Sequence, residues 1–300
     1  MTERASGDPG AAPIGLAVID KPAGWTSHDV VARSRRLLGT RKVGHSGTLD
    51  PMATGVLVLG VGPATRLLRF LSGLPKSYEA LIRFGSETDS LDADGRVTVT
   101  HDMAVPAPNA VRAAASTLTG ELLQVPPMVS AKNVDGTRLH ELARRGEVVE
   151  RAPVPIAVHR FDVEPTADPM AYVAHVECSA GTYVRVLASD LGHALGGGAH
   201  LGALRRTAVG PFGLGEAVSL DELDAGALLA PSAICRILDH VEVDDAAATD
   251  IGHGKVLERG RLGLGDTAEG PWAVLDADGG LIAVYEAHRG TTVKPALVLS

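Results

Sequence analysis

Aromatic residues are scarce in this chain of 300 residues, because Phe, Trp and Tyr together make up only 3% of it. Long apolar runs are missing as well: no stretch of about 18 apolar residues occurs, which argues against a membrane-spanning helix. Only two cysteines occur, Cys178 and Cys235, and they form neither a C-x-x-C pair nor a metal-ligand spacing. These absences speak against a disulfide framework and a metal site, and they favour a reducing, cytoplasmic location.

The remaining composition is that of an ordinary soluble globular protein, with 45% hydrophobic and 21% charged residues. The length allows one large or two modest domains with a substantial core. Residues 1–13 are small, polar and rich in Gly and Pro, so we expect a disordered tail there. This stretch lacks the basic and apolar regions of a signal peptide.

An overall basic charge is also missing, since the formal net charge is −8. Nucleic-acid binding draws on Lys and Arg contacts to phosphate, so composition alone does not suggest an RNA partner. The charge is unevenly distributed: residues 1–70 carry 9 Lys and Arg against 5 Asp and Glu, whereas residues 221–300 carry 6 against 14. The first part is therefore locally basic, and its arginine-rich stretch at 33–42 is either a solvated helix face or a phosphate-binding rim.

The most informative stretch is GHSGTLDPMATG at residues 44–55, in which glycines and a proline surround a single carboxylate, Asp50. Pro51 disfavours helical backbone at Asp50, and the apolar run at 56–59 predicts a buried strand. A lone acid on a rigid loop that leads into a core strand suits a nucleophile or general base. The alternative is an Asp that caps its own turn, and spacing alone does not decide between the two.

Hydrophobic periodicity predicts several further elements. The first predicted helix follows Ser27 and ends before Gly39, with Val30, Val31, Leu37 and Leu38 inward. Two further helices are predicted at 108–123 and 184–195. The predicted strands are 78–84, 172–178, 272–275 and 281–285, the last two joined by a hairpin turn at 276–280. Residues 85–95 are expected to form an acidic turn.

Five motifs in a fixed order, over roughly residues 15–210, resemble the TruB family of tRNA pseudouridine synthases. Residues 44–55 are similar to the family's catalytic loop, G-H-x-G-T-L-D-P-x-A-[ST]-G. The other four are Asp20 to Ser27 (DKPAGWTS), Lys76 to Tyr78 (KSY), Gly181 to Arg185 (GTYVR), and GAHL at 198–201 with LRR at 204–206.

The resemblance implies an α+β fold. We expect a mixed, largely antiparallel sheet with flanking helices and a thumb-like insertion at about 124–152, followed by a small β-rich, PUA-like C-terminal domain. The corresponding boundaries are 14–235 for the catalytic domain and 236–300 for the C-terminal domain. The insertion departs from the family pattern, because Lys132 is displaced by one position and His140 stands where Tyr is usual.

The resemblance also implies a role for each motif residue. Asp50 is the catalytic acid, Arg185 its ion-pair partner, and Tyr78 the ring that stacks on the base and assists removal of the C5 proton. Substrate contacts are expected from Tyr183 and Leu204 as pocket walls, His45 in the space left by a flipped nucleotide, and Lys21. A guanidinium fork suits this site because a carboxylate must stay ionised in a dry pocket.

The implied reaction is the isomerisation of uridine 55 in the T-loop of tRNA to pseudouridine. The uridine must leave its stack to be reached, and folded RNA is read by shape and by splayed loop nucleotides. An isomerisation needs no redox cofactor, ATP or metal, so we expect no cofactor. The stand-alone bacterial type is favoured, as a monomer without an obligate protein partner.

Two rival functions follow from other interpretations of the same residues. A non-catalytic chaperone would bind and refold the tRNA arm without chemistry, and this role is compatible with catalysis. A hydrolase using His45, Ser46 and Asp50 is disfavoured because the three lie within one turn and G-x-S-x-G is absent. The sequence leaves open whether Asp50 attacks C1′, attacks C6 or only removes a proton.

Overall fold

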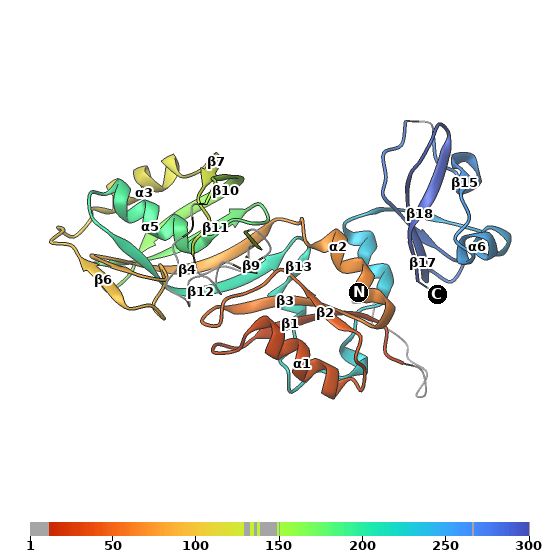
Figure 1. Ribbon diagram of the computed structural model, residues 1–300, viewed down its shortest axis with the longest axis horizontal. Coiled ribbons are helices and arrows are strands. Elements are labelled where there is room, and N and C mark those ends of the chain that lie inside the picture. Colours follow the sequence, from red (N-terminus) through yellow and green to blue (C-terminus); the bar gives the residue numbers. More distant parts are fainter. Residues whose placement is uncertain are drawn as a thin grey trace.

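The computed structural model describes residues 12–128, 133–134, 137–138, 149, 151–265 and 267–299. These residues form an elongated molecule, in which a long central sheet is followed by a smaller C-terminal sheet at one end (Figure 1). Strands of the central sheet follow the order β1-β3-β12-β4-β11-β10-β7, with β2 added beside β3 and β13 beside β12. The predicted α+β fold with largely antiparallel pairing is confirmed.

The strands of the central sheet are β1 (Gly15–Lys21), β2 (Val43–Ser46), β3 (Thr54–Val61), β4 (Lys76–Phe84), β7 (Gly120–Gln124), β10 (Val154–Pro165), β11 (Ala171–Cys178), β12 (Ala199–Val209) and β13 (Phe212–Gly213). Two short hairpins are β5 (Ser86–Thr88) with β6 (Val97–Thr100), and β8 (Asn133–Val134) with β9 (Thr137–Arg138). The α-helices are α1 (Ser27–Leu37), α2 (Leu68–Leu71), α3 (Pro108–Thr117), α5 (Val184–Ala194) and α6 (Asp245–Gly252).

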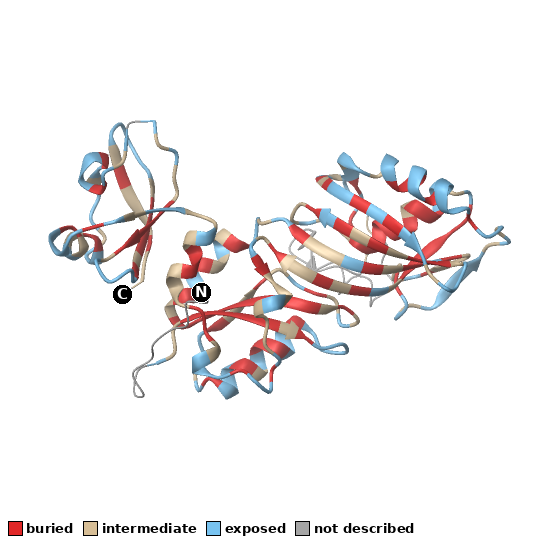
Figure 2. Ribbon diagram, turned by 180° about the vertical axis from the view of Figure 1, so that it is seen from behind, coloured by how far each residue is buried: buried red, intermediate tan, exposed pale blue. Residues whose placement is uncertain are grey.

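Strand β12 joins the two halves of the central sheet. It pairs antiparallel with β4 along most of its length, and near its end it pairs parallel with β3 through Arg205 and Arg206. Helices α3 and α5 pack on the half formed by β4, β10 and β11, whereas α1 packs on the half formed by β1, β2 and β3. Figure 2 shows the buried residues concentrated along these strands and on the inner faces of the helices.

Helix α1 begins at Ser27, one residue earlier than the sequence predicts. Thr26 is its N-cap and forms a capping box with Asp29, which satisfies free backbone N–H groups of the first turn. Val30, Val31 and Leu38 are buried, but Leu37 is 36% exposed, so its predicted inward position is wrong. Leu37 is the last residue of the helix, and the chain turns away at Gly39 with a φ of +63°.

The helix predicted at 108–123 is wrong in its second part. Helix α3 ends at Thr117, and Gly120 takes a φ of +103°, which interrupts the helix. The chain then continues as β7, whose backbone pairs with β10 from Gly120 to Gln124. Pairing at the sheet edge therefore overrides the helical pattern, and Leu123 is left 73% exposed.

The acidic segment at 85–95 is more than a turn. It contains β5 and a tight loop closed by a backbone hydrogen bond from Leu91 N–H to Thr88 O, with Leu91 at a φ of +64°. Leu201 of β12 holds this loop from the other side through hydrogen bonds with Leu91 O and Ala93 N–H. The loop consequently lies against the sheet, and one of its acids, Asp92, is buried.

The C-terminal sheet has the order β14-β16-β17-β18-β15. Its strands are β14 (Asp239–Glu242), β15 (Leu257–Glu258), β16 (Trp272–Leu275), β17 (Leu281–Ala287) and β18 (Thr292–Val298). The predicted hairpin is confirmed, because β16 and β17 pair antiparallel and Asp276 N–H donates to Gly280 O at 2.9 Å. Apolar residues of this sheet share a core with the preceding segment at 231–236 and with β1 and β3.

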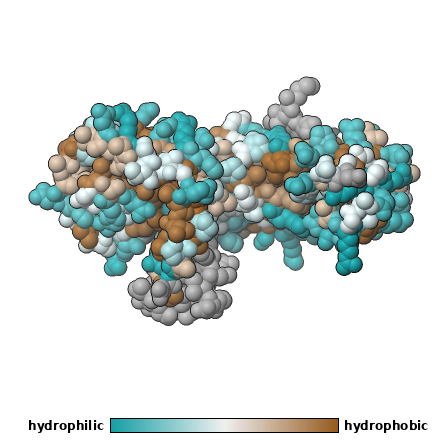
Figure 3. Space-filling view, turned by 90° about the horizontal axis from the view of Figure 1, so that it is seen from above, coloured by the Kyte–Doolittle hydropathy of each residue, from teal (hydrophilic) through white to brown (hydrophobic). Residues whose placement is uncertain are grey.

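Within the described residues, no helix combines the length and apolar character that a bilayer crossing requires. The face of the molecule in Figure 3 carries hydrophobic patches between hydrophilic areas. The predicted tail at 1–13 and the thumb-like insertion at 124–152 fall largely outside the described residues. The departures at Lys132 and His140 lie outside them as well.

Candidate active site

Residues 47–55, here called the catalytic-type loop, lead from β2 into β3, and glycines set the path of this loop. Gly47 has a φ of +80° and Gly55 a φ of +99°, a region of backbone space that side chains disfavour. A Cβ atom at Gly55 would also lie 2.2 Å from the Arg206 carbonyl oxygen, so only glycine permits this approach of β3 to β12. Asp50 stands between these two fixed points, just before Pro51.

Lys21 fastens this loop to the end of β1. Its ammonium group donates to the carbonyl oxygens of Trp25 at 2.6 Å, Pro22 at 3.0 Å and Pro51 at 3.2 Å. The side chain is fully buried, and desolvation is the main cause that lowers the pKa of Lys21 to about 8. Its role in the structure is thus to hold two loops together beneath Asp50. The predicted substrate contact by Lys21 stays a prediction.

Asp50 faces a guanidinium fork. Arg185 Nε lies 3.2 Å from Asp50 Oδ2, and Arg185 Nη2 lies 3.5 Å from Asp50 Oδ1. Arg185 comes from the first turn of α5 and is only 3% exposed. The ion pair predicted between these two residues is therefore present in the structure.

Arg185 also binds a second carboxylate. Its Nη1 atom lies 3.3 Å from Asp92 Oδ2 and donates to the Ser90 carbonyl oxygen at 3.2 Å. Asp92 accepts hydrogen bonds from Ser90 Oγ at 2.5 Å and from Asp94 N–H at 3.2 Å. These two bonds stabilise its negative charge inside the loop. Arg185 is thus held by Asp92 while it is presented to Asp50.

The charges around Asp50 work against one another. Burial raises the pKa of Asp50 above its ordinary value, the Arg185 guanidinium opposes the rise, and the negative charge of Asp92 adds to it. The raised pKa makes Asp50 a better base than an exposed aspartate. It also means that Asp50 needs a higher pH to be ionised.

Tyr78 and Arg206 form the opposite side of the site. Arg206 is 1% exposed, its guanidinium donates to Val56 O at 2.7 Å and to Gly47 O at 3.0 Å, and it lines the same cavity as Tyr78. Burial raises the pKa of the Tyr78 hydroxyl, which keeps it protonated. Arg206 therefore links the start of the catalytic-type loop to the tyrosine ring.

These side chains enclose a cavity of about 300 Å³, within the range that receives a small planar ligand. The predicted residues that line it are Asp50, Tyr78, Tyr183, Arg185 and Leu204. They come from the catalytic-type loop, β4, α5 with the residue before it, and β12, so the fold brings together residues from across the sequence.

His45 lies beside the cavity and not in its wall. It precedes the catalytic-type loop on β2, and its ring meets the edge of His28 at a centroid distance of 5.4 Å and an angle of 82°. Burial is the main cause that lowers the pKa of His45 to about 4, so its imidazole is neutral near pH 7. Its Nδ1 atom is buried and has no hydrogen-bond partner among the residues that the structure describes.

Sequence reasoning missed Asp92 and Arg206 as site residues. Asp92 is one of several acids in a segment that resembles a solvated turn, and only the tertiary contact with Arg185 distinguishes it. Arg206 stands inside a motif that the sequence does contain, LRR at 204–206. The alternation of β12 was the available signal, since it places Arg206 on the same face as Leu204 and Arg205 on the other.

The fold brings a carboxylate paired with a buried arginine and a tyrosine to the wall of one cavity, an arrangement typical of an enzyme active site. Family models match the chain in three consecutive parts. Residues 35–184 match the N-terminal domain of the TruB family pseudouridylate synthases, residues 185–242 the C-terminal domain of tRNA pseudouridylate synthase B, and residues 238–300 the C-terminal part of tRNA pseudouridine synthase II. The chain belongs to the TruB family and is a tRNA pseudouridine synthase, as its motifs predict.

Relatives match over nearly the whole length. The chain is 48% identical to tRNA pseudouridine synthase B of Arthrobacter sp. (strain FB24), over 95% of this chain and 96% of that protein. It is 46% identical to tRNA pseudouridine synthase B of Rhodococcus jostii (strain RHA1), over 100% of this chain and 98% of that protein. Among solved structures, it is similar to a chain of a Cbf5-Nop10-Gar1 complex with a TM-score of 0.74 and 25% identity, over 100% of this chain and 92% of that chain.

Proposed function

We propose that this protein converts uridine 55 in the T-loop of tRNA to pseudouridine. The family and its relatives support uridine isomerisation in tRNA, and the ordered motifs support the position within the T-loop. The observation that carries the proposed site is the fork of Arg185 on Asp50 at a cavity that also presents Tyr78.

The reaction moves one bond of the ribose from N1 of uracil to C5. The N1–C1′ bond breaks, the uracil rotates, a C5–C1′ bond forms, and the proton on C5 is removed while N1 gains one. The base must be flipped out of the RNA to enter the cavity, which costs a few kcal/mol. Asp50 serves as nucleophile at C1′, as nucleophile at C6 or as base, and each of these roles needs its ionised form.

Each residue of the cavity then has a defined task. Arg185 offsets part of the pKa rise that burial causes at Asp50, because an adjacent cation lowers the pKa of an acid. It thereby favours the ionised carboxylate. Tyr78 stacks on the uracil, and its protonated hydroxyl reaches the C5 side of the ring. Tyr183 and Leu204 wall the cavity during rotation of the base, and the neutral ring of His45 fills the space that the flipped nucleotide leaves.

The test measures tritium release from [5-³H]uridine in T-arm RNA, with Asp50→Asn beside the wild type. Release by the wild type alone would support both the reaction and the assignment of Asp50. Substituting the uridine at position 55 of the RNA should abolish release. Release that persists from another position would contradict the proposed T-loop specificity.

A chaperone role is part of the same proposal, because flipping a base and closing on the arm can refold tRNA without chemistry. Asp50→Asn should therefore still accelerate refolding of a misfolded tRNA, since the variant keeps the cavity walls. We also propose that residues 14–235 form the catalytic domain and residues 236–300 a PUA-like domain, in a cytoplasmic monomer. Size measurement in solution and truncation at 235 test these last points.

A further inference from the structure

The segment from Pro22 to His28 is exposed at its surface and firmly attached beneath. Gly24 N–H donates to Pro51 O at 2.8 Å, and the Lys21 ammonium bridges the carbonyl oxygens of Trp25 and Pro51. Ser27 Oγ accepts from Leu49 N–H at 2.9 Å and donates to Leu49 O at 3.3 Å. These hydrogen bonds join the segment to both sides of Asp50, so it moves with the catalytic-type loop as one unit.

Trp25 is the aromatic residue that this unit presents to solvent. It is 36% exposed, whereas the other tryptophan, Trp272, is 3% exposed within the C-terminal sheet. Among the described residues, Trp25 is the one aromatic side chain in the exposed class. The ring–ring and cation–ring contacts found there involve other residues, so the indole face of Trp25 is not occupied in this way.

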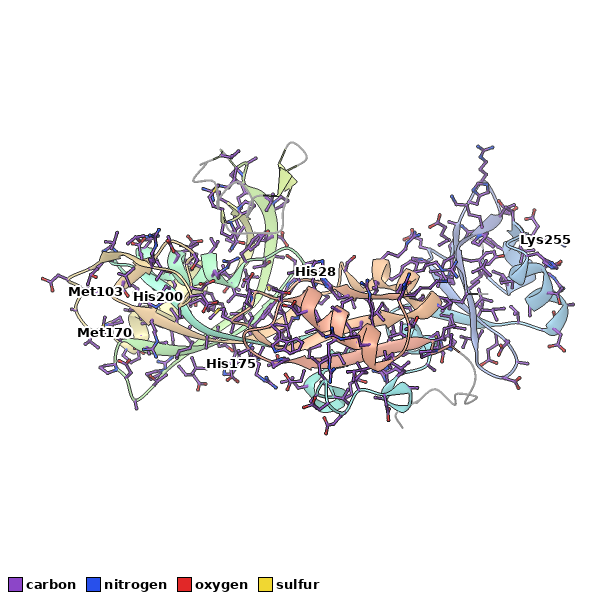
Figure 4. The ribbon with its side chains drawn as sticks, turned by 60° about the horizontal axis from the view of Figure 1, so that its bottom comes forward. His28, Met103, Met170, His175, His200 and Lys255 are labelled. Atoms are coloured by element: carbon purple, nitrogen blue, oxygen red, sulfur yellow. The ribbon has the colours of Figure 1, made fainter. Side chains whose placement is uncertain are left out.

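The backbone of Trp25 lies beside the loop that carries Asp50, because the carbonyl oxygens of Trp25 and Pro51 accept from the same Lys21 ammonium. His28 is three residues further on, in the first turn of α1, and lies near the middle of the molecule in Figure 4. The ring of His28 contacts His45 at the entrance to the catalytic-type loop. Trp25 thus belongs to the rim of the same loop that carries Asp50.

We propose that Trp25 is a stacking platform for an unpaired RNA base next to the nucleotide that enters the cavity. The inference rests on the proposed function, since it requires RNA at this site. Stacking of a base on an aromatic side chain tolerates any sequence, because every base has a π-face. The hydrogen bonds beneath Trp25 fix the backbone that carries the ring before RNA arrives, so little backbone freedom is lost on binding.

A purely structural role makes a different prediction. Trp25 precedes the N-cap Thr26, and Val30 is at the fourth position of the helix, which is the spacing of a hydrophobic staple. A staple needs an apolar side chain but no aromatic face. Leucine at position 25 keeps the staple and loses the stacking surface, whereas phenylalanine keeps both.

The experiment measures Kd and turnover of a T-arm RNA hairpin with the full chain. Trp25→Leu should weaken binding about tenfold at unchanged kcat, and Trp25→Phe should bind much like the wild type. Leu37→Ala, which removes an equally exposed apolar residue at the far end of α1, is the matched control and should bind normally. In Trp272→Phe, where Trp25 is the remaining tryptophan, RNA should quench the indole emission.

Wild-type affinity in Trp25→Leu, or an emission that RNA leaves unchanged, would overturn the stacking role. A second result would also overturn the stacking role. If Trp25→Ala lowers the thermal stability, and Trp25→Leu has wild-type stability and RNA affinity, Trp25 acts only as the hydrophobic staple. A wild-type protein that neither binds nor isomerises the hairpin would instead remove the proposed function, and the inference with it.

Discussion

Two loops meet at Arg185, and the sequence indicated a functional role for only one of them. The loop at 47–55 is rich in glycine, contains a proline and carries one acid. The loop at 86–96 carries several acids and resembles a solvated surface turn. In the structure both deliver a carboxylate to the same guanidinium, Asp50 from one side and Asp92 from the other. The comparison teaches that a charge is functional through its partner and its burial, not through its local sequence.

The two carboxylates differ in exposure and in task. The side chain of Asp50 is 35% exposed and opens to the cavity, whereas that of Asp92 is 5% exposed and enclosed by its own loop. The carboxylate of Asp92 accepts hydrogen bonds from Ser90, Asp94 N–H and Arg185, and its burial keeps it away from a ligand in the cavity. We therefore interpret Asp50 as the reacting group and Asp92 as a positioning group, and substitutions can separate these roles.

The largest effect is expected for Asp50→Asn, which removes the reacting carboxylate but keeps its shape. Tritium release should fall by at least about 10³-fold, as is usual for loss of a nucleophile or base. RNA affinity and thermal stability should change little. Retention of more than a tenth of the wild-type rate would contradict the assignment.

Arg185→Lys should come next, because a point charge cannot contact Asp50 and Asp92 at the same time. We expect a loss of about 100-fold in kcat/KM in the same assay, corresponding to one or two charge-assisted hydrogen bonds. Arg205→Lys is the matched control: Arg205 forms a similar fork with Asp20 at 2.6 and 3.1 Å on the other face of β12. Equal losses in the two variants would show a general need for arginine on this sheet.

Asp92→Asn should reduce kcat about tenfold, because Arg185 loses the charge that orients it. Asp94→Asn controls for loop charge, since Asp94 is exposed and contacts Asp92 only through its backbone N–H. An effect of Asp94→Asn as large as that of Asp92→Asn would mean that overall loop charge matters, not the buried contact.

The pH profile distinguishes the two acids further. Asp50 must be ionised and its pKa is raised, so the rate should fall as the pH drops through that raised value. In Asp92→Asn one cause of the rise is gone, so the acidic limb of the profile should move to lower pH. An unmoved limb in kcat/KM for this variant would show that Asp92 does not act on Asp50 electrostatically.

Ser90→Ala gives the smallest expected effect. It removes one hydrogen bond to Asp92, which retains Arg185 and the Asp94 N–H as partners. The free energy of unfolding should fall by about 1 kcal/mol, and turnover by less than threefold. Urea denaturation and the release assay check both. A loss as large as that of Asp92→Asn would place the control of Arg185 in the loop hydroxyl.

Much of the fold could be predicted from periodicity. The strands around 56–59, 78–84 and 172–178 and the helices α1 and α5 lie where their patterns place them, because each buries one continuous apolar stripe or face. The second part of the helix at 108–123 failed because pairing with β10 outweighs local propensity. The predicted inward position of Leu37 was wrong because Leu37 is the last residue of α1, where the chain leaves the helix.

The residues of the candidate site also fall into a predicted and an unpredicted group. Asp50, Tyr78, Tyr183, Arg185 and Leu204 were predicted by motif resemblance, and the cavity brings them together. Asp92 and Arg206 depend on contacts between segments more than 90 residues apart in the chain, Arg185 with Asp92 and Arg206 with Val56. The contact between Arg185 and Asp92 leaves no local pattern, so the tertiary structure alone reveals it, whereas the alternation of β12 already places Arg206 on the face of Leu204.

Strand β12 sets a limit on how this protein can vary in length. Arg205 and Arg206 are neighbours that serve opposite faces, one holding Asp20 and the other holding the catalytic-type loop. Side chains of a regular strand alternate with a period of two, so inserting or deleting a single residue between the register shift at Leu201 and Ala203 and these two arginines would exchange the two faces. The gene segment for β12 should therefore tolerate substitutions far better than changes of its length, even where every motif residue is kept.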